Sequence, residues 1–216
     1  MTDQTAPDSR LAFDRAAQRR LFEALVEAVV ANATELTDLD RAIGDGDHGI
    51  NLSRGFKAVA QQMDALIELP LGPALKEVGK RLVMSVGGAS GPLFGTLFMA
   101  LGDRLAASEP LSRRIVVDAC TAAVTAVKAR GKSDAGQKTM LDVLLPVADE
   151  LSAGEGDVLN RLADRAAHAA EATIPLRAQR GRAAFLGERS VGHMDPGARS
   201  SQLLIAAACA SLREPQ

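Results

Sequence analysis

An all-helical fold is the prediction that this sequence supports, on the evidence of its composition and its apolar periodicity. Leucine and alanine dominate the hydrophobic 47% of its 216 residues, while Trp and Tyr are absent and only six phenylalanines occur. Strands draw on β-branched and aromatic side chains, so this composition favours helix. The length suits one domain with a sizeable core. We assign residues 1–10 to a polar tail and residues 11–216 to a single helical domain.

The helices can be predicted in order from apolar spacing and from the residues that limit them. Leu21, Leu25 and Val29 recur at four-residue intervals and mark one face of the first helix. Pro70 and Gly87 limit the third. The predicted helices cover residues 11–33, 50–66, 70–86, 93–107, 111–130, 139–151, 159–180 and 200–212. Prolines at positions 146 and 175 are expected to kink the sixth and bend the seventh. No strand is predicted.

Four of the connecting segments are glycine-rich or charged, and they occupy alternate connections between the predicted helices. They span residues 38–51, 87–91, 131–138 and 181–197. In an up-and-down array of helices, alternate connections lie at the same end. The sequence therefore predicts that the four loops form one site.

The first of these loops carries three carboxylates within eight residues, Asp40, Asp45 and Asp47. Carboxylates this close repel one another unless a cation or a proton neutralises them. Oxygen ligands suit magnesium or calcium. An EF-hand is excluded because its twelfth position falls on Phe56. A solvent-exposed capping turn, in which Asp is common, explains the loop equally well when it is considered alone.

The other loops carry features that suit a phosphate. The glycine-rich stretch 87–91 precedes a helix, whose N-terminal amides can bind an anion, although a flexible turn is the alternative. Arg182 can pair with a phosphate through two hydrogen bonds. Together with the acidic loop, these features favour a nucleotide site.

Charge and cysteine content narrow the class of protein. The net charge of −2 gives no basic field for nucleic acid or anionic lipid. Cys120 and Cys209 are too few and too far apart for a disulfide framework or a zinc site, so we expect free thiols. No stretch is apolar over the roughly 20 residues that a membrane span needs, and no signal peptide is visible. A cytoplasmic protein is expected.

The four loops together resemble the L subunit, or ADP-binding subunit, of bacterial dihydroxyacetone kinase. The matching stretches occur in the family's order and spacing: LDRAIGDGDHGINLSRGF (39–56), SVGGASGPLFGT (85–96), RGK…GQKTMLDV (130–143) and GRAAFLGERSVGHMDPGARSS (181–201). The resemblance extends over nearly the whole chain. The middle of the third stretch, residues 132–138, matches least specifically.

This resemblance implies an eight-helix antiparallel up-and-down barrel with a nucleotide site at one end. It implies that Asp40, Asp45 and Asp47 hold two magnesium ions, which bridge to the phosphates of ADP or ATP. The residues that it assigns to the nucleotide are His48, Gly49, Ile50, Asn51, Ala89, Ser90, Gly131, Met140, Arg182, Asp195, Pro196 and Gly197. No residue is assigned as a nucleophile or as a base.

The function implied by the resemblance is phosphoryl transfer to dihydroxyacetone. The ketose is held by a separate K subunit, and ADP stays bound as a cofactor that a phosphotransferase-system protein rephosphorylates. Alternatives stay open: exchangeable ATP as the substrate, a four-carbon ketose as the acceptor, or a nucleotide-loaded regulatory module that docks on a transcriptional regulator or another enzyme. A homodimer is also open.

Overall fold

The computed structural model of the protein describes residues 13–105, 111–154 and 156–213. The predicted tail, residues 1–10, lies outside the described residues. The elements are α1 (Arg15–Ala31), α2 (Ala33–Ile43), α3 (His48–Ala60), α4 (Met63–Ile67), α5 (Leu71–Ser85), α6 (Ser90–Leu105), α7 (Arg113–Gly131), α8 (Leu141–Ala153), α9 (Val158–Glu171), the 3-10 helix η1 (Arg182–Ser190) and α10 (Pro196–Ser211). No strand occurs within these ranges, which confirms the predicted all-α class.

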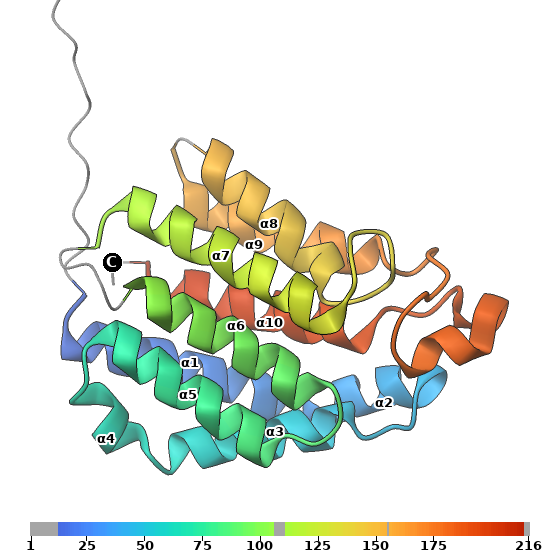
Figure 1. The fold of residues 1–216 in the computed structure, drawn as a ribbon, viewed down its shortest axis with the longest axis horizontal. Coiled ribbons are helices and arrows are strands. Elements are labelled where there is room, and N and C mark those ends of the chain that lie inside the picture. Colours follow the sequence, from blue (N-terminus) through green and yellow to red (C-terminus); the bar gives the residue numbers. More distant parts are fainter. Residues whose placement is uncertain (1–12, 106–110, 155, 214–216) are drawn as a thin grey trace, which may run out of the picture.

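The eight longest helices, apart from the short α2 and α4, close into an antiparallel ring (Figure 1). Each packs on the next in the order α1, α3, α5, α6, α7, α8, α9, α10, and α10 returns to α1. The inward faces form one main apolar core. Phe56 and Phe98 meet inside it edge to face, with ring centroids 6.2 Å apart. The eight-helix up-and-down barrel implied by the resemblance is therefore present.

Several element boundaries differ from the predictions. Residues 33–43, predicted to pass into a polar loop, form α2, because Leu36, Asp40 and Ile43 lie on one buried helical face. The predicted helix 50–66 is interrupted at residues 61–62 and becomes α3 and α4. The predicted helix 159–180 ends at Glu171, and residues 172–181 are turns and coil. The last helix begins at Pro196 rather than at residue 200, since Asp195 caps it.

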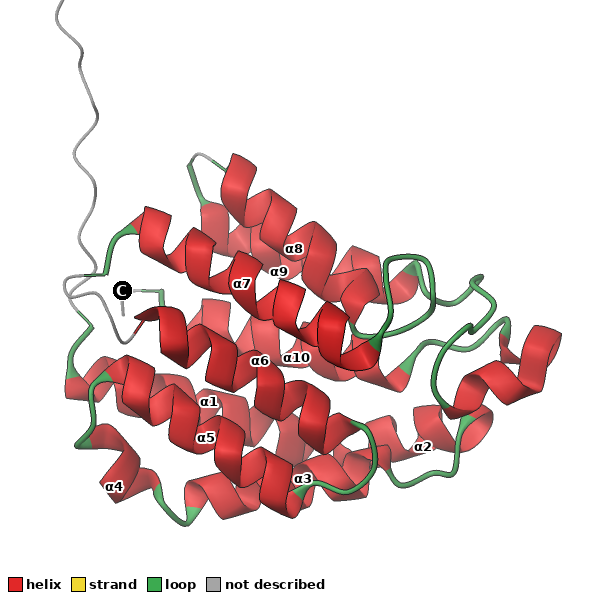
Figure 2. Ribbon diagram, viewed as in Figure 1, coloured by secondary structure: helices red, strands yellow, loops and turns green. Residues whose placement is uncertain are grey.

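The four alternate connections lie together at one end of the barrel, as predicted. Figure 2 shows the green connections α2–α3, α5–α6, α7–α8 and α9–α10 gathered at the right-hand end. The α9–α10 connection contains η1, which packs beside α2. Cys120 and Cys209 are free thiols, in agreement with the sequence analysis, and burial raises both of their pKa values. None of the helices in the described ranges is long and apolar enough to cross a membrane.

Candidate functional site

A cavity of about 410 Å³ opens at this end of the barrel and takes walls from all four loops. Its volume is within the range of small-molecule sites. Most of the predicted site residues line it: Asp40, Asp45, Asp47, His48, Ala89, Ser90, Gly131, Met140, Arg182, Asp195, Pro196 and Gly197. The structure thus brings together residues that are more than 150 positions apart in the sequence.

Three predicted residues do not line the cavity. Gly49 is buried against α2, where an added Cβ would lie 2.0 Å from the carbonyl oxygen of Ala33. Ile50 has 60% of its surface exposed and faces a separate shallow groove. The Asn51 side chain lies against Gly87, at 3.0 Å from an ideal Cβ on that glycine. Asn51 therefore supports the glycine-rich loop from behind.

The three carboxylates of the acidic loop converge on one point. Asp40 comes from the last turn of α2, while Asp45 and Asp47 flank Gly46, whose φ of 73° turns the chain back. One oxygen from each carboxylate lies within 4.8 Å of those from the other two. Asp40 Oδ2 accepts hydrogen bonds from the backbone amides of Asp47 (2.9 Å) and His48 (3.1 Å). The cluster is thus built by the backbone as well as by the side chains.

This donor set fits a hard divalent cation. Asp40 is buried at its base, Asp47 is half-buried and Asp45 is exposed, so the cluster opens toward the cavity. A magnesium ion takes a few carboxylates in this way and fills its other positions with water or phosphate oxygen. Arg182 forms an ion pair with the cluster, with 3.0 Å between its Nη2 and Asp45 Oδ2.

His48 connects three helices behind the cluster. It is the first residue of α3, and its Nδ1 lies 2.9 Å from the Oγ of Ser90 at the start of α6. Its Nε2 lies 3.0 Å from the Oγ of Ser200 in α10. Burial lowers the pKa of His48, although the nearby charges of Asp40 and Asp47 oppose that effect. The histidine therefore holds Ser90 at the edge of the cavity.

Lys138 is a buried cation that the sequence analysis did not single out. Only 1% of its surface is exposed, and its backbone adopts a positive φ of 61°. Its Nζ donates hydrogen bonds to the carbonyl oxygens of Thr173 (2.8 Å), Leu176 (3.0 Å) and Ile174 (3.2 Å), and also to that of His193. One ammonium thus fixes both arms of the long α9–α10 connection against the α7–α8 loop.

Asp195 lies beside this lysine in a buried environment, whereas the acidic loop is open to the cavity. Its carboxylate caps α10 by accepting from the amide of Ala198 at 2.7 Å, and Thr173 Oγ1 accepts from its backbone amide at 3.1 Å. Burial raises the pKa of Asp195 to about 7, with a further contribution from Asp142 and opposition from Lys138. The residue is a cap that binds a proton readily.

Other residues that line the cavity also escaped the sequence analysis. Arg130, Ser133, Thr139 and Arg180 contribute polar groups, whereas Leu93, Phe94 and Val127 contribute apolar ones. Arg130 lies in the last turn of α7, and the other three polar residues stand in loops with no distinguishing pattern. The apolar ones follow the ordinary helical period, so their sequence positions indicate only a core.

The fold and the site define a class of protein, an antiparallel helical barrel with a carboxylate cluster at the mouth of an end cavity. Residues 42–210 match the model of the DAK2 domain. The chain belongs to the DAK2 domain family.

Named relatives share most of the chain. It is 41% identical over 176 residues to the ADP-binding subunit DhaL of the PEP-dependent dihydroxyacetone kinase of Escherichia coli strain K12, which covers 79% of this chain and 84% of that subunit. It is 37% identical to a D-erythrulose kinase of Mycolicibacterium smegmatis, over 85% of this chain and 33% of that enzyme. The crystal structure of the dihydroxyacetone kinase of C. freundii in complex with AMP-PNP and Mg²⁺ is 26% identical and superposes with a TM-score of 0.73, over 98% of this chain and 36% of that one.

Proposed function

We propose that the chain is the nucleotide-binding subunit of a dihydroxyacetone kinase. In this proposal it passes a phosphoryl group from a magnesium-bound nucleotide to dihydroxyacetone on a separate K subunit. The observation that carries the proposal is the convergence of Asp40, Asp45 and Asp47 at a cavity whose other walls come from three further loops. The similarity to an ADP-binding subunit supports the choice of nucleotide and of ketose.

The cavity lining combines apolar and polar residues, which suit the two ends of a nucleotide. Leu93, Val127 and Met140 are apolar and would contact the base. The acidic cluster, Ser90 and Arg182 are polar and would contact the phosphates. The N-terminal amides of α6 add an anion-binding group there.

The chain's own residues would position the phosphates rather than react with them. Asp40, Asp45 and Asp47 would hold two magnesium ions, which when bound neutralise the charge on the phosphoryl oxygens. The backbone amides of residues 47 and 48 keep Asp40 in place. Arg182, now paired with Asp45, is in position to bind the phosphates through its guanidinium. Alignment and charge neutralisation are the main requirements of phosphoryl transfer.

Activation of the ketose is assigned to another chain. Among the described residues that line the cavity, His48 is the only imidazole, and serine hydroxyls engage both of its nitrogens. This histidine is therefore not free to act as a base for a sugar hydroxyl, and the carboxylate of Asp195 is engaged as the cap of α10. We further propose that ADP remains bound and that a phosphotransferase-system protein rephosphorylates it, which the PEP-dependent relative supports.

The decisive experiment identifies what the purified protein carries. The protein is denatured and the released nucleotide is identified and quantified. Stoichiometric ADP is the expected result and supports the cofactor version. Free exchange of ATP supports ATP as a consumed substrate instead. Failure to bind either nucleotide in the presence of Mg²⁺ would exclude both.

A second candidate differs only in the acceptor. The similarity to a D-erythrulose kinase favours a four-carbon ketose as an alternative to dihydroxyacetone. Product analysis with both ketoses, in the presence of the K subunit, distinguishes the two.

A further inference from the structure

Phe185 is the most exposed of the large apolar side chains in the described ranges. It lies in η1, and 90% of its surface is exposed, whereas the other phenylalanines are buried or half-buried. Scattered exposed apolar residues are common on proteins. An aromatic ring left almost wholly in solvent at the end that carries the cavity is unusual enough to need a reason.

The segment that presents Phe185 is held in place. Ala183 and Leu186 of η1 pack with Ile43 and Ala178 in a small apolar cluster. Ser190 Oγ accepts from the amide of Ala178 at 2.9 Å and donates to the carbonyl of Gly187 at 2.7 Å. The backbone that carries Phe185 is therefore held in place, which lowers the entropy cost of binding a partner.

The segment that carries Phe185 is basic, although the protein as a whole is acidic. Residues 177–189 contain four arginines (177, 180, 182 and 189) and one glutamate (188), a net charge of +3 in a chain of net charge −2. All five of these side chains are exposed. Arg180 and Arg182 also line the cavity. An aromatic anchor on a basic segment complements an apolar socket bordered by carboxylates.

The position of η1 connects this surface to the chemistry. In Figure 1, η1 is the orange-red helical segment that projects at the right-hand end, beside α2, and Arg182 at its start reaches the acidic cluster. A protein docked on η1 therefore faces the opening of the cavity. Any acceptor of a phosphoryl group has to approach through that opening.

We infer that η1, with Phe185 as its anchor, is the docking element for the protein that presents the ketose. The inference rests on the proposed function and deepens it, since it assigns the contact surface of the acceptor-bearing subunit. That subunit should offer an apolar socket with an acidic rim. Docking places the ketose hydroxyl opposite the phosphates and excludes water from them.

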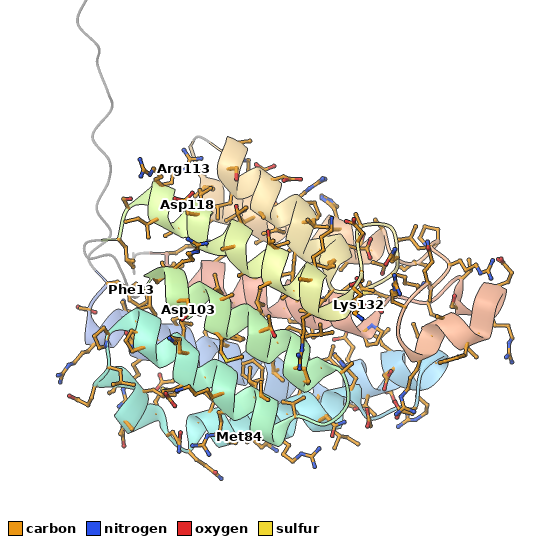
Figure 3. All side chains as sticks on the ribbon, in the orientation of Figure 1. Phe13, Met84, Asp103, Arg113, Asp118 and Lys132 are labelled. Atoms are coloured by element: carbon orange, nitrogen blue, oxygen red, sulfur yellow. The ribbon has the colours of Figure 1, made fainter. Side chains whose placement is uncertain are left out.

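The test compares Phe185→Ser with two other variants. Phe185→Tyr keeps an aromatic ring, and Met84→Ser removes another exposed apolar side chain, at 70% exposure, on the outer face of α5 (Figure 3). We expect Phe185→Ser to raise the concentration of K subunit needed for half-maximal transfer by about tenfold or more, as for an interface anchor. The rate at saturating K subunit should change less than twofold, and Phe185→Tyr and Met84→Ser should behave as the wild type.

Two further quantities are measured in each variant. They are the amount of bound ADP and the affinity of the nucleotide-free protein for the K subunit. Loss of ADP from the wild type would contradict the proposed function, whereas intact ADP with an unchanged requirement for K subunit in Phe185→Ser would contradict only the docking inference. The inference is equally overturned if the variant impairs rephosphorylation by the phosphotransferase-system protein alone. A shift from dimer to monomer in sedimentation, with docking unchanged, would show that Phe185 binds a second copy instead.

Discussion

The aspartates of the α2–α3 connection and Asp195 lie at the same end of the barrel, in opposite electrostatic environments. Asp40, Asp45 and Asp47 open toward the cavity with their oxygens close together. Asp195 is buried, caps α10 and has its pKa raised to about 7. The first arrangement concentrates negative charge where a cation can enter, whereas the second favours a proton. The comparison separates carboxylates suited to ligand binding from one suited to holding the fold.

The largest expected effect lies in the acidic cluster. Asp45→Ala or Asp47→Ala should reduce magnesium-dependent ADP binding by about a hundredfold or more, because each removes one of the few carboxylate ligands. Helical content measured by circular dichroism should be unchanged, since neither side chain is fully buried. Asp38→Ala is the matched control, as Asp38 is an exposed aspartate on α2 that pairs with Arg41. Equal losses in all three variants, or unfolding, would favour a capping role for the cluster.

The second expected effect concerns the lysine that organises the surroundings of Asp195. Lys138→Met leaves four backbone carbonyls without their shared donor. Buried unpaired groups of this kind cost about 1–3 kcal/mol each before relaxation, so a net loss of about 3 kcal/mol is expected. In a domain of this size the melting temperature should fall by roughly 10 °C. ADP affinity should also fall, because the α7–α8 and α9–α10 walls of the cavity lose their common support.

Lys132→Met is the control for this prediction. Lys132 stands in the same loop with a comparable positive φ of 47°, but its side chain is exposed, and Figure 3 places it at the end of α7. Its replacement should change stability by less than about 0.5 kcal/mol. Calorimetry gives the melting temperature of both variants. Similar values would mean that the ammonium of Lys138 contributes little to the stability of the fold.

The two aspartate environments also differ in how well the sequence predicts them. The acidic cluster was predictable because its three members lie within eight residues and glycines separate them. The gathering of four loops was predictable from the alternation of helical connections. The closed eight-helix ring was implied by the family resemblance and not by periodicity, since periodicity indicates which face of a helix is buried but not its neighbour.

Features that depend on distant partners left no local signal. Lys138 binds carbonyls 35 to 55 positions away, and in the sequence it is one polar residue in a polar loop. The α2 helix was mistaken for a loop because Thr37, Asp38 and Asp40 are polar, although Thr37 and Asp40 are buried beside Leu36 and Ile43. These polar side chains are buried, so a prediction that treats polar residues as exposed places a loop where the structure has a helix.

The last expected effect concerns Asp195 and depends on pH. Its pKa of about 7 in the folded protein exceeds the value of about 3.9 expected for the unfolded chain. The folded state therefore binds the proton more tightly, and the stability that this contributes is fully present below about pH 4. It is lost as the pH rises toward 7. Asp195→Asn keeps an oxygen to cap α10 but does not ionise.

The melting temperatures of wild type and Asp195→Asn, both free of nucleotide and metal, should therefore diverge with pH. Near pH 4 the two should agree within a few degrees, and above pH 7 the variant should melt at a higher temperature than the wild type. Groups that titrate in both proteins cancel in the difference. Parallel curves across this range would mean that Asp195 ionises in the folded protein as it does in the unfolded chain. Its pairing with Lys138 would then outweigh its burial, and the two carboxylate environments would differ in geometry alone.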